Sequence, residues 1–241
     1  MALPKLTVPE YEAILPSTEK VLKYRPFLVK EEKILLTALE AEDDDIMADA
    51  IRQIVNNCVL EELDVFKLPT FDIEYLFLRL RAKSVGENVT LGLKPWGCPK
   101  NKGELCENST QVDIDLEEVN VIKNDKHSNK IMLDDKIGIK LSYPDLSKLG
   151  KVDKIDTAES GMDIIKDCID MIFTEEETFD KGTFDDKELD EFVESLNTQQ
   201  FTLIKDFFDT MPVLKHTAKY KCDTCGEKKE TVIQGLNSFF G

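Results

Sequence analysis

Four cysteines in two groups are the residues of this sequence with the clearest capacity for chemistry. Cys222 and Cys225 form a Cys-x-x-Cys motif followed by Gly226, between two segments whose polarity alternates as it does in strands. Glycine permits the backbone angle that a tight turn needs, so two thiolates can converge on one ion there. The motif is therefore typical of one half of a zinc knuckle.

The other half of that site is expected at Cys98 and Cys106, in a stretch rich in glycine and proline. Seven residues separate these two cysteines, whereas about two to four are usual. Because structural zinc takes four ligands and leaves no open position for a substrate, we predict one structural, non-catalytic zinc ion. Its predicted ligands are Cys98, Cys106, Cys222 and Cys225.

Two other interpretations of these cysteines stay open. The motif could be a knuckle that holds no metal and keeps its thiols reduced. It could also be a redox dithiol, although no βαβ pattern typical of a thioredoxin-like fold surrounds it. The two remaining cysteines, Cys58 and Cys168, lie on the apolar faces of expected helices, which indicates buried core residues.

The motifs of common enzymes are missing from the sequence. His127 and His216 are its only histidines, and they form no metal-binding pair. Neither of the two common phosphate-binding glycine motifs occurs, nor does the Gly-x-Ser-x-Gly motif of hydrolases. The acidic clusters at 40–45 and 180–190 do not have the ligand spacing of an EF-hand. We therefore predict that the protein is not an enzyme.

The composition restricts the class of protein further. The 241 residues carry a formal net charge of −17, which disfavours binding to nucleic acid or to an anionic membrane surface. An apolar fraction of 41% is enough for a buried core. No apolar stretch approaches the roughly 20 residues of a membrane-spanning helix, and the first residues lack the apolar core of a secretory signal. We expect a cytosolic protein without nucleic-acid partners or membrane insertion.

The first third of the chain is expected to be helical. An extended arm reaches to residue 15, and a short strand covers 20–24. Apolar residues then recur at helical spacing, and the aspartates of the first acidic cluster are placed to cap the second helix. The expected helices cover residues 30–39, 46–58 and 70–82.

From residue 85 onward the pattern changes to that of strands and then returns to helices. Alternation with a period of two predicts strands at 88–93 and 111–122 and a hairpin at 130–141. Helical spacing follows, and the end of the chain alternates again. The later helices are expected at 156–173, 185–196 and 198–211, a polar linker at 174–186, and the last strands at 218–222 and 231–233.

These elements predict an α+β fold in three parts. Residues 1–84 form an arm and a helical N-terminal unit. Residues 85–142 with 215–241 form a small antiparallel β-module similar to a zinc ribbon, and residues 143–214 form a helical insertion. The insertion would be closed into one loop by the metal, because predicted ligands lie on both sides of it.

Two groups of residues are candidate partner-binding sites. Tyr24, Arg25 and Phe27 stand in a basic stretch of an acidic chain, and tyrosine and arginine are frequent interface anchors. The alternative is that Phe27 and Tyr24 staple the arm onto the first helix. Phe239 and Phe240, near the end of the sequence, either fold back beside the knuckle or insert into a partner, and we favour the partner.

Three blocks of the sequence point to a known family. They are KYRPFLVKEEKILL at 23–36, FDIEYLFLRLRAKS at 71–84 and GLNSFF at 235–240. The chain thereby resembles the baseplate hub subunit family of T4-like contractile-tailed phages, most clearly over residues 1–90 and at its C-terminal end.

The resemblance implies a structural role in the central baseplate hub or in its assembly, and it supplies no catalytic residues. The implied partners are other hub, tube or tape measure proteins, in a symmetric oligomeric assembly. The implied location is the tail baseplate of the virion, after assembly in the host cytoplasm. Two alternatives stay open: a tail-assembly chaperone for the tape measure protein, and a zinc-ribbon adaptor for transcription machinery.

Overall fold

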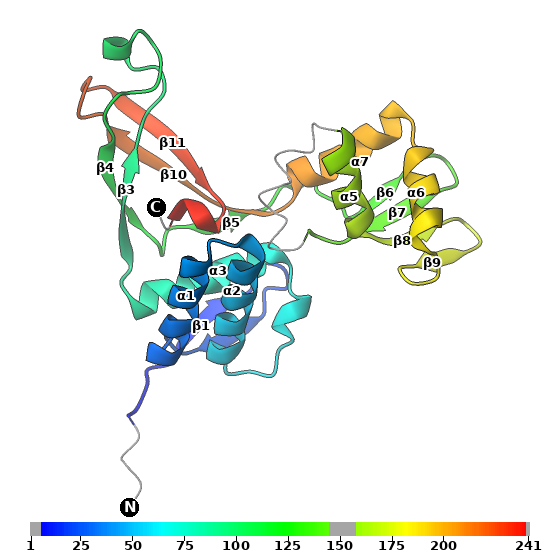
Figure 1. Ribbon diagram of the computed structural model, residues 1–241, viewed down its shortest axis with the longest axis horizontal. Helices are drawn as coiled ribbons and strands as arrows, with labels where there is room; N and C mark the ends of the chain where they lie inside the picture. The colour runs from blue at the N-terminus through cyan, green and yellow to red at the C-terminus, as the bar shows by residue number, and fades with distance from the viewer. Residues whose placement is uncertain (1–5, 145–157, 240–241) are drawn as a thin grey trace, which may run out of the picture. The chain divides into compact units, whose positions relative to one another are not determined.

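The computed structural model describes residues 6–144 and 158–239, and the chain divides into two compact units. Unit 1 contains Met1–Ile122 and Val213–Gly241, and unit 2 contains Lys123–Pro212. The chain therefore leaves unit 1 after Ile122, forms unit 2 and returns to unit 1 at Val213 (Figure 1). Helices and antiparallel sheets occur in both units, so the predicted α+β class is confirmed.

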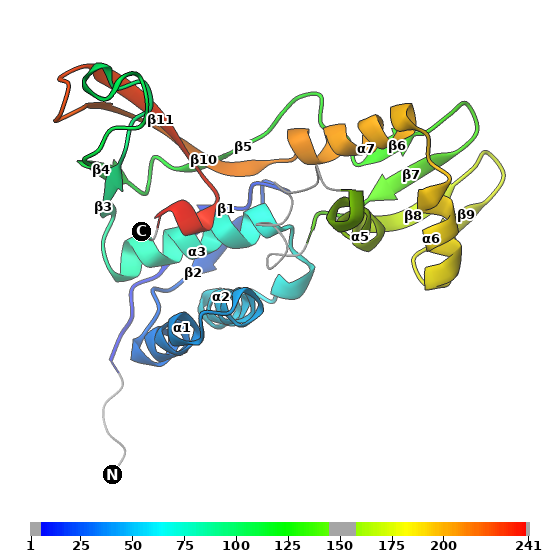
Figure 2. The same ribbon diagram turned by 45° about the horizontal axis from the view of Figure 1, so that its top comes forward.

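Unit 1 begins with a hairpin and three helices. The Asp43 side chain accepts the backbone N–H groups of Asp45 and Ile46, which confirms the aspartate cap predicted for the second helix. That helix packs against both of the others and leaves the first as the outermost of the three (Figures 1 and 2). The elements are β1 (Tyr11–Ile14), β2 (Val21–Tyr24), α1 (Val29–Ala41), α2 (Asp44–Cys58) and α3 (Thr70–Ser84).

The helix α3 is the centre of unit 1, because most of its side chains are buried. Asp72 on this helix is fully buried, and its carboxylate accepts the backbone N–H of Ser17 at 3.0 Å. A buried charge is costly unless it is hydrogen-bonded, so this bond fixes the turn between β1 and β2 to α3. The apolar residues that α3 contributes to the core are Phe71, Ile73, Leu76, Phe77, Leu78, Leu80 and Ala82.

The β-module of unit 1 consists of two sets of antiparallel strands. β3 (Asn88–Leu93) pairs with β4 (Thr110–Asp115) as one hairpin. β10 (Val213–Lys221) is the middle strand of a second sheet and pairs with both β11 (Lys228–Gln234) and β5 (Asn120–Ile122). Strands from residues 88–122 and from the end of the chain therefore build one module.

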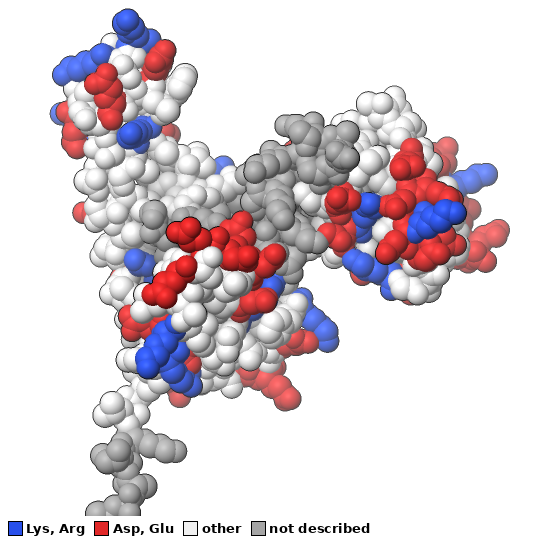
Figure 3. Space-filling model, viewed as in Figure 1, with Lys and Arg blue, Asp and Glu red and all other residues white. Residues whose placement is uncertain are grey.

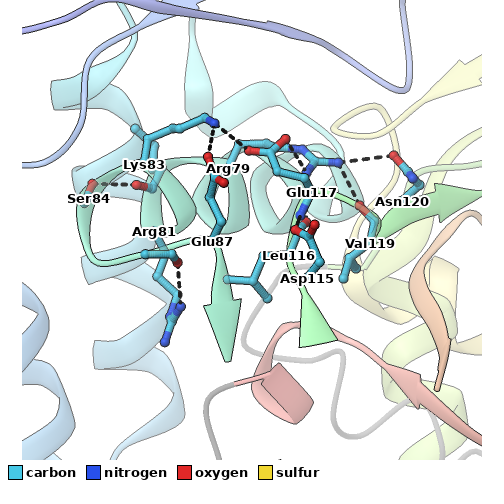
Figure 4. Close-up of polar contacts among 12 residues, drawn as sticks. Arg79, Arg81, Lys83, Ser84, Glu87, Asp115, Leu116, Glu117, Val119 and Asn120 are labelled. Atoms are coloured by element: carbon cyan, nitrogen blue, oxygen red, sulfur yellow. Dashed lines mark hydrogen bonds and ion pairs between the residues drawn. The ribbon is translucent and has the colours of Figure 1, made fainter. Parts of the chain in front are cut away.

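The strand predicted at 111–122 is interrupted, because a buried arginine of α3 binds the chain between β4 and β5. The Arg79 guanidinium donates to the carbonyl oxygens of Leu116 and Val119, each at 2.8 Å (Figure 4). It also donates to the carboxylate of Glu117 at 3.1 Å. In an extended strand, carbonyls three residues apart point to opposite edges, so two that point at one guanidinium require the chain to turn here.

In its described residues, 123–144 and 158–212, unit 2 has a four-stranded antiparallel sheet and three helices that share one apolar core. The sheet order is β6-β7-β8-β9, and the core includes Ile139, Ile165, Ile204 and Phe207. The elements are β6 (Lys130–Met132), β7 (Gly138–Leu141), α5 (Ala158–Cys168), β8 (Ile169–Phe173), β9 (Thr178–Asp180), α6 (Asp186–Glu194) and α7 (Thr198–Thr210).

The helix predicted at 156–173 ends early in the structure. After Cys168 the chain continues as β8, in which Ile172 pairs with Ile139 of β7. A run rich in isoleucine is compatible with a buried strand as well as with a helix. Here pairing with the neighbouring strand favours the strand. The polar linker expected at 174–186 correspondingly contains the short edge strand β9.

The observed division of the chain also differs from the three parts expected from the sequence. The hairpin at 130–141 was expected in the β-module, and it lies in unit 2, where β7 pairs with β8. Alternation along the chain identifies a strand but does not specify its partner. The insertion in unit 1 is therefore residues 123–212, and it has a sheet as well as helices.

Candidate metal centre

Three of the predicted cysteine ligands form one buried cluster in the β-module. The sulfur atoms of Cys98, Cys106 and Cys222 lie within 4.8 Å of one another, and the side chains are 0–2% exposed. The distance from Cys106 Sγ to Cys222 Sγ is 3.8 Å. Three buried thiols this close together could hold a metal ion.

Cys222 is positioned by the tight turn that joins β10 to β11. Its backbone N–H donates to the carbonyl of Glu227 at 2.9 Å, and its own carbonyl accepts the N–H of Gly226 at 2.8 Å. Gly226 has a φ of 77°, in the left-handed region that disfavours other residues. The turn that the sequence predicted from this glycine is confirmed.

Cys98 and Cys106 are brought together by a loop that folds back on itself between β3 and β4. The Cys98 N–H donates to the carbonyl of Glu104 at 3.1 Å, and the Cys106 N–H donates to that of Pro95 at 3.0 Å. A short 3₁₀ turn, Pro99–Asn101, occupies the loop between them. The seven intervening residues therefore form a closed turn, which is why an unusually long spacing still places both sulfur atoms together.

Polar contacts also join the β3–β4 hairpin to the β10–β11 hairpin beside the cluster. The Asp223 N–H donates to the buried Thr110 hydroxyl at 3.1 Å. The Lys229 ammonium donates to the Gly97 carbonyl at 3.0 Å and pairs with the Glu227 carboxylate at 2.9 Å. Thr110 and Lys229 could not be identified from the sequence, because neither residue type nor spacing reveals a contact across more than 100 residues.

Cys225 packs against the cluster and is partly exposed. The pKa of Cys222 is lowered to about 6, chiefly because the backbone N–H of Cys225 donates to its sulfur. Burial raises the pKa of Cys98, and hydrogen bonding with Cys106 and Cys225 adds to that rise. These contacts place Cys225 beside the other thiols.

The candidate partner-binding residues near the N-terminus have partners within unit 1. Tyr24 is 2% exposed, and its ring lies 5.8 Å from that of Tyr11. Arg25 donates to the carboxylate of Glu31 at 3.0 Å, and the backbone N–H of Phe27 donates to Ser84 Oγ at 2.9 Å. These contacts favour the alternative in which the basic stretch is stapled to the helices.

Of the two phenylalanines predicted to bind a partner near the end of the sequence, the structure describes Phe239. Phe239 is fully buried at the end of a 3₁₀ turn, Leu236–Phe239, that lies against α3. This burial favours the fold-back alternative for Phe239. Phe240 lies outside the described residues.

Comparison with known proteins places the chain in a family. No curated protein and no solved structure matches the chain. Among the helices of residues 6–144 and 158–239, none has the length and apolar character needed to cross a membrane. A family model described as T4 bacteriophage base plate protein matches residues 8–241, almost the whole sequence. The chain belongs to this T4 base plate protein family.

Proposed function

We propose that the protein is a structural component of the central baseplate hub of a contractile-tailed phage. The family match over residues 8–241 is the observation that carries this proposal. Membership of a baseplate family implies association with other tail proteins in the virion, and we expect hub, tube or tape measure proteins as neighbours. The role proposed here is binding and assembly, without catalysis.

We further propose that the cysteine cluster binds one structural zinc ion, with Cys225 as the fourth ligand. In a regular tetrahedron with Zn–S bonds of about 2.3 Å, the sulfur atoms lie about 3.8 Å apart. The separation of Cys106 Sγ and Cys222 Sγ is 3.8 Å, and that of the three buried sulfur atoms is at most 4.8 Å. The spacing of these three sulfur atoms supports a tetrahedral thiolate site, and Cys225, which packs against them, is proposed to complete it.

Zinc at this position would stabilise the β-module by joining its two hairpins. The described contacts between the hairpins there include the hydrogen bonds from Asp223 and Lys229 and the contact between the Cys106 and Cys222 thiols. Metal binding to cysteines that are separate in the unfolded chain contributes directly to the free energy of folding. With four thiolates, the ion would have no position for a substrate.

The zinc proposal is tested by metal analysis of the full chain and its variants. We expect about one zinc ion per chain in protein purified without chelator, and loss of that zinc in Cys98→Ser. Cys58→Ser is the matched control, because Cys58 is equally buried in unit 1 but lies outside the cluster. The control should keep its zinc. Wild-type protein without zinc, or equal zinc in both variants, would contradict the proposal.

The hub proposal is tested by mass spectrometry of purified virions and of tail-assembly intermediates. A hub component should be present in both. The net charge of −17 also suits a tail-assembly chaperone that binds the tape measure protein and then leaves. Presence in intermediates but absence from virions would favour that chaperone over the hub component.

A further inference from the structure

A zinc ion bound by the cysteine cluster would leave a negative charge that the surrounding protein must balance. Four thiolates around a divalent ion leave two of their four negative charges unbalanced. The side chains of Cys98, Cys106 and Cys222 are 0–2% exposed, so water screens little of this charge. A buried charge is costly unless hydrogen bonds or an opposite charge compensate it. A cation beside the cluster therefore bears directly on metal binding, and this inference rests on the zinc site proposed above.

Backbone N–H groups supply part of this compensation. The sulfur of Cys222 accepts the N–H groups of Cys225 and Thr224, and the sulfur of Cys98 accepts that of Lys100. Such hydrogen bonds stabilise a thiolate. These donors are neutral, however, so they leave the net charge of the site unchanged.

Lys229 of β11 brings a positive charge to the cluster. Its ammonium donates to the carbonyl of Gly97 at 3.0 Å, and Gly97 directly precedes Cys98. The same ammonium pairs with the carboxylate of Glu227 at 2.9 Å. The backbone carbonyl of Glu227 in turn accepts the N–H of Cys222. One ammonium thus joins the two segments that carry the cysteines.

The carboxylate that pairs with Lys229 does not cancel the effect of the ammonium on the cluster. The Lys229 side chain is 17% exposed, whereas that of Glu227 is 51% exposed, so water screens the carboxylate more strongly. The pKa of Lys229 is raised, chiefly by its hydrogen bond with Glu227. The charges of Cys225 and Cys98 add to that rise, which places the ammonium within electrostatic reach of both sulfur atoms.

The other charged side chains of these segments are less suited to this role. Every other lysine, aspartate and glutamate of residues 94–107 and 219–230 is exposed. They comprise six lysines and five acidic residues, so their charges nearly cancel. Figure 3 shows the two signs side by side at this outer end of the β-module. Lys229 is thus the lysine of these segments whose charge water screens least.

We propose that Lys229 is a positioning residue of the zinc site. Its ammonium holds the loop that carries Cys98 against the turn that carries Cys222, and its charge offsets part of the negative charge of the thiolates. Replacing a residue that supports the ligands of a metal typically changes metal affinity about 10- to 100-fold. We therefore expect Lys229 to slow the release of zinc from the protein.

The first test measures how fast the zinc-loaded full chain releases its metal to an excess of a chelating dye, followed by absorbance. Lys229→Met should release zinc about tenfold faster than the wild type, because methionine keeps most of the apolar stem and loses the charge. Lys229→Arg keeps the charge and should restore slow release. Lys228→Met is the matched control, because Lys228 is exposed and lies on the opposite face of β11, and it should behave as the wild type.

The second test separates the charge of Lys229 from a purely structural ion pair. Glu227→Gln removes the negative partner, while its amide oxygen can still accept the ammonium. If the ammonium acts on the thiolates, this variant should release zinc at least as slowly as the wild type. Faster release would show that the ion pair itself holds the turn, and it would overturn the proposal. Since Glu227 is half exposed, this test remains decisive even where Lys229→Met does not fold.

The outcomes also distinguish this inference from the zinc proposal on which it rests. A wild type that binds no zinc would contradict the zinc site itself. Zinc-loaded wild type and Lys229→Met that release the metal at the same rate would overturn only the role of Lys229. Release from Lys229→Arg as fast as from Lys229→Met would overturn it too, because the charge would then make no difference.

Discussion

A buried carboxyl group on α3 holds the C-terminal segment of unit 1. Glu74 is 6% exposed, and its Oε1 accepts the backbone N–H of Leu236 at 2.9 Å. Burial raises the pKa of Glu74 to about 7, and this one hydrogen bond offsets only part of the rise. The residue thus couples the docking of the segment 236–239 to pH.

The substitution Glu74→Gln should make unit 1 less sensitive to pH. The pKa of Glu74 is higher in the folded than in the unfolded chain, so the folded state keeps a proton that the unfolded state releases. The contribution of this group to stability therefore falls as the pH rises from 5 to 8, by about 2–3 kcal/mol. Glutamine can still accept the Leu236 N–H without ionising. Urea unfolding at both pH values should show that the free energy of unfolding falls less from pH 5 to pH 8 in the variant than in the wild type.

At the scale of elements, the buried Arg79 links α3 to the strands of the β-module. Its guanidinium satisfies the Leu116 and Val119 carbonyls and also contacts Asn120 Oδ1 at 3.2 Å. This one side chain sets the turn between β4 and β5, and β5 in turn pairs with β10. The register of the module thus depends on a residue of the neighbouring helix.

Replacing Arg79 by methionine should lower the free energy of unfolding by about 2–4 kcal/mol. Methionine fills part of the volume but leaves two buried carbonyl groups without donors. Arg81→Met is the control, because Arg81 donates to the Gly86 carbonyl at the longer distance of 3.3 Å and is partly exposed. Denaturant titration of both variants gives the comparison. An equal loss of unfolding free energy in both variants would show that the Arg79 contacts do not stabilise the turn.

At the scale of the whole molecule, unit 2 is inserted between two residues of unit 1 that pair with each other. Ile122 and Val213, the residues on either side of the insertion, are directly paired across the antiparallel strands β5 and β10. Paired residues of antiparallel strands have Cα atoms about 5 Å apart, a gap that a tight turn can span. Unit 1 therefore needs no part of unit 2 to connect its chain.

A chain in which Asn-Gly replaces residues 123–212 should fold as unit 1. Such a pair favours the turn that joins two antiparallel strands, so β5 and β10 would become one hairpin. We expect cooperative thermal unfolding and the same zinc content as the full chain, measured by circular dichroism and metal analysis. Loss of cooperative unfolding would show that unit 1 depends on unit 2 for its stability.

Features that depend on residues close together in the chain could be predicted from the amino-acid sequence. The Asp43 cap, the amphipathic helices of unit 1 and the glycine turn after Cys225 each involve residues a few positions apart, so their signals survive without a partner. The two cysteine pairs are also local features, because a single turn or loop brings the two cysteines of each pair together.

The contacts between distant segments of the chain could not be predicted in the same way. Cys106 and Cys222 lie 116 positions apart, and Arg79 breaks a strand about 40 positions away from itself. Ile172 joins a strand because Ile139 is beside it, and Phe239 is buried because α3 offers it a surface. Such choices depend on packing and hydrogen bonds between distant segments, and local patterns of polarity do not encode them.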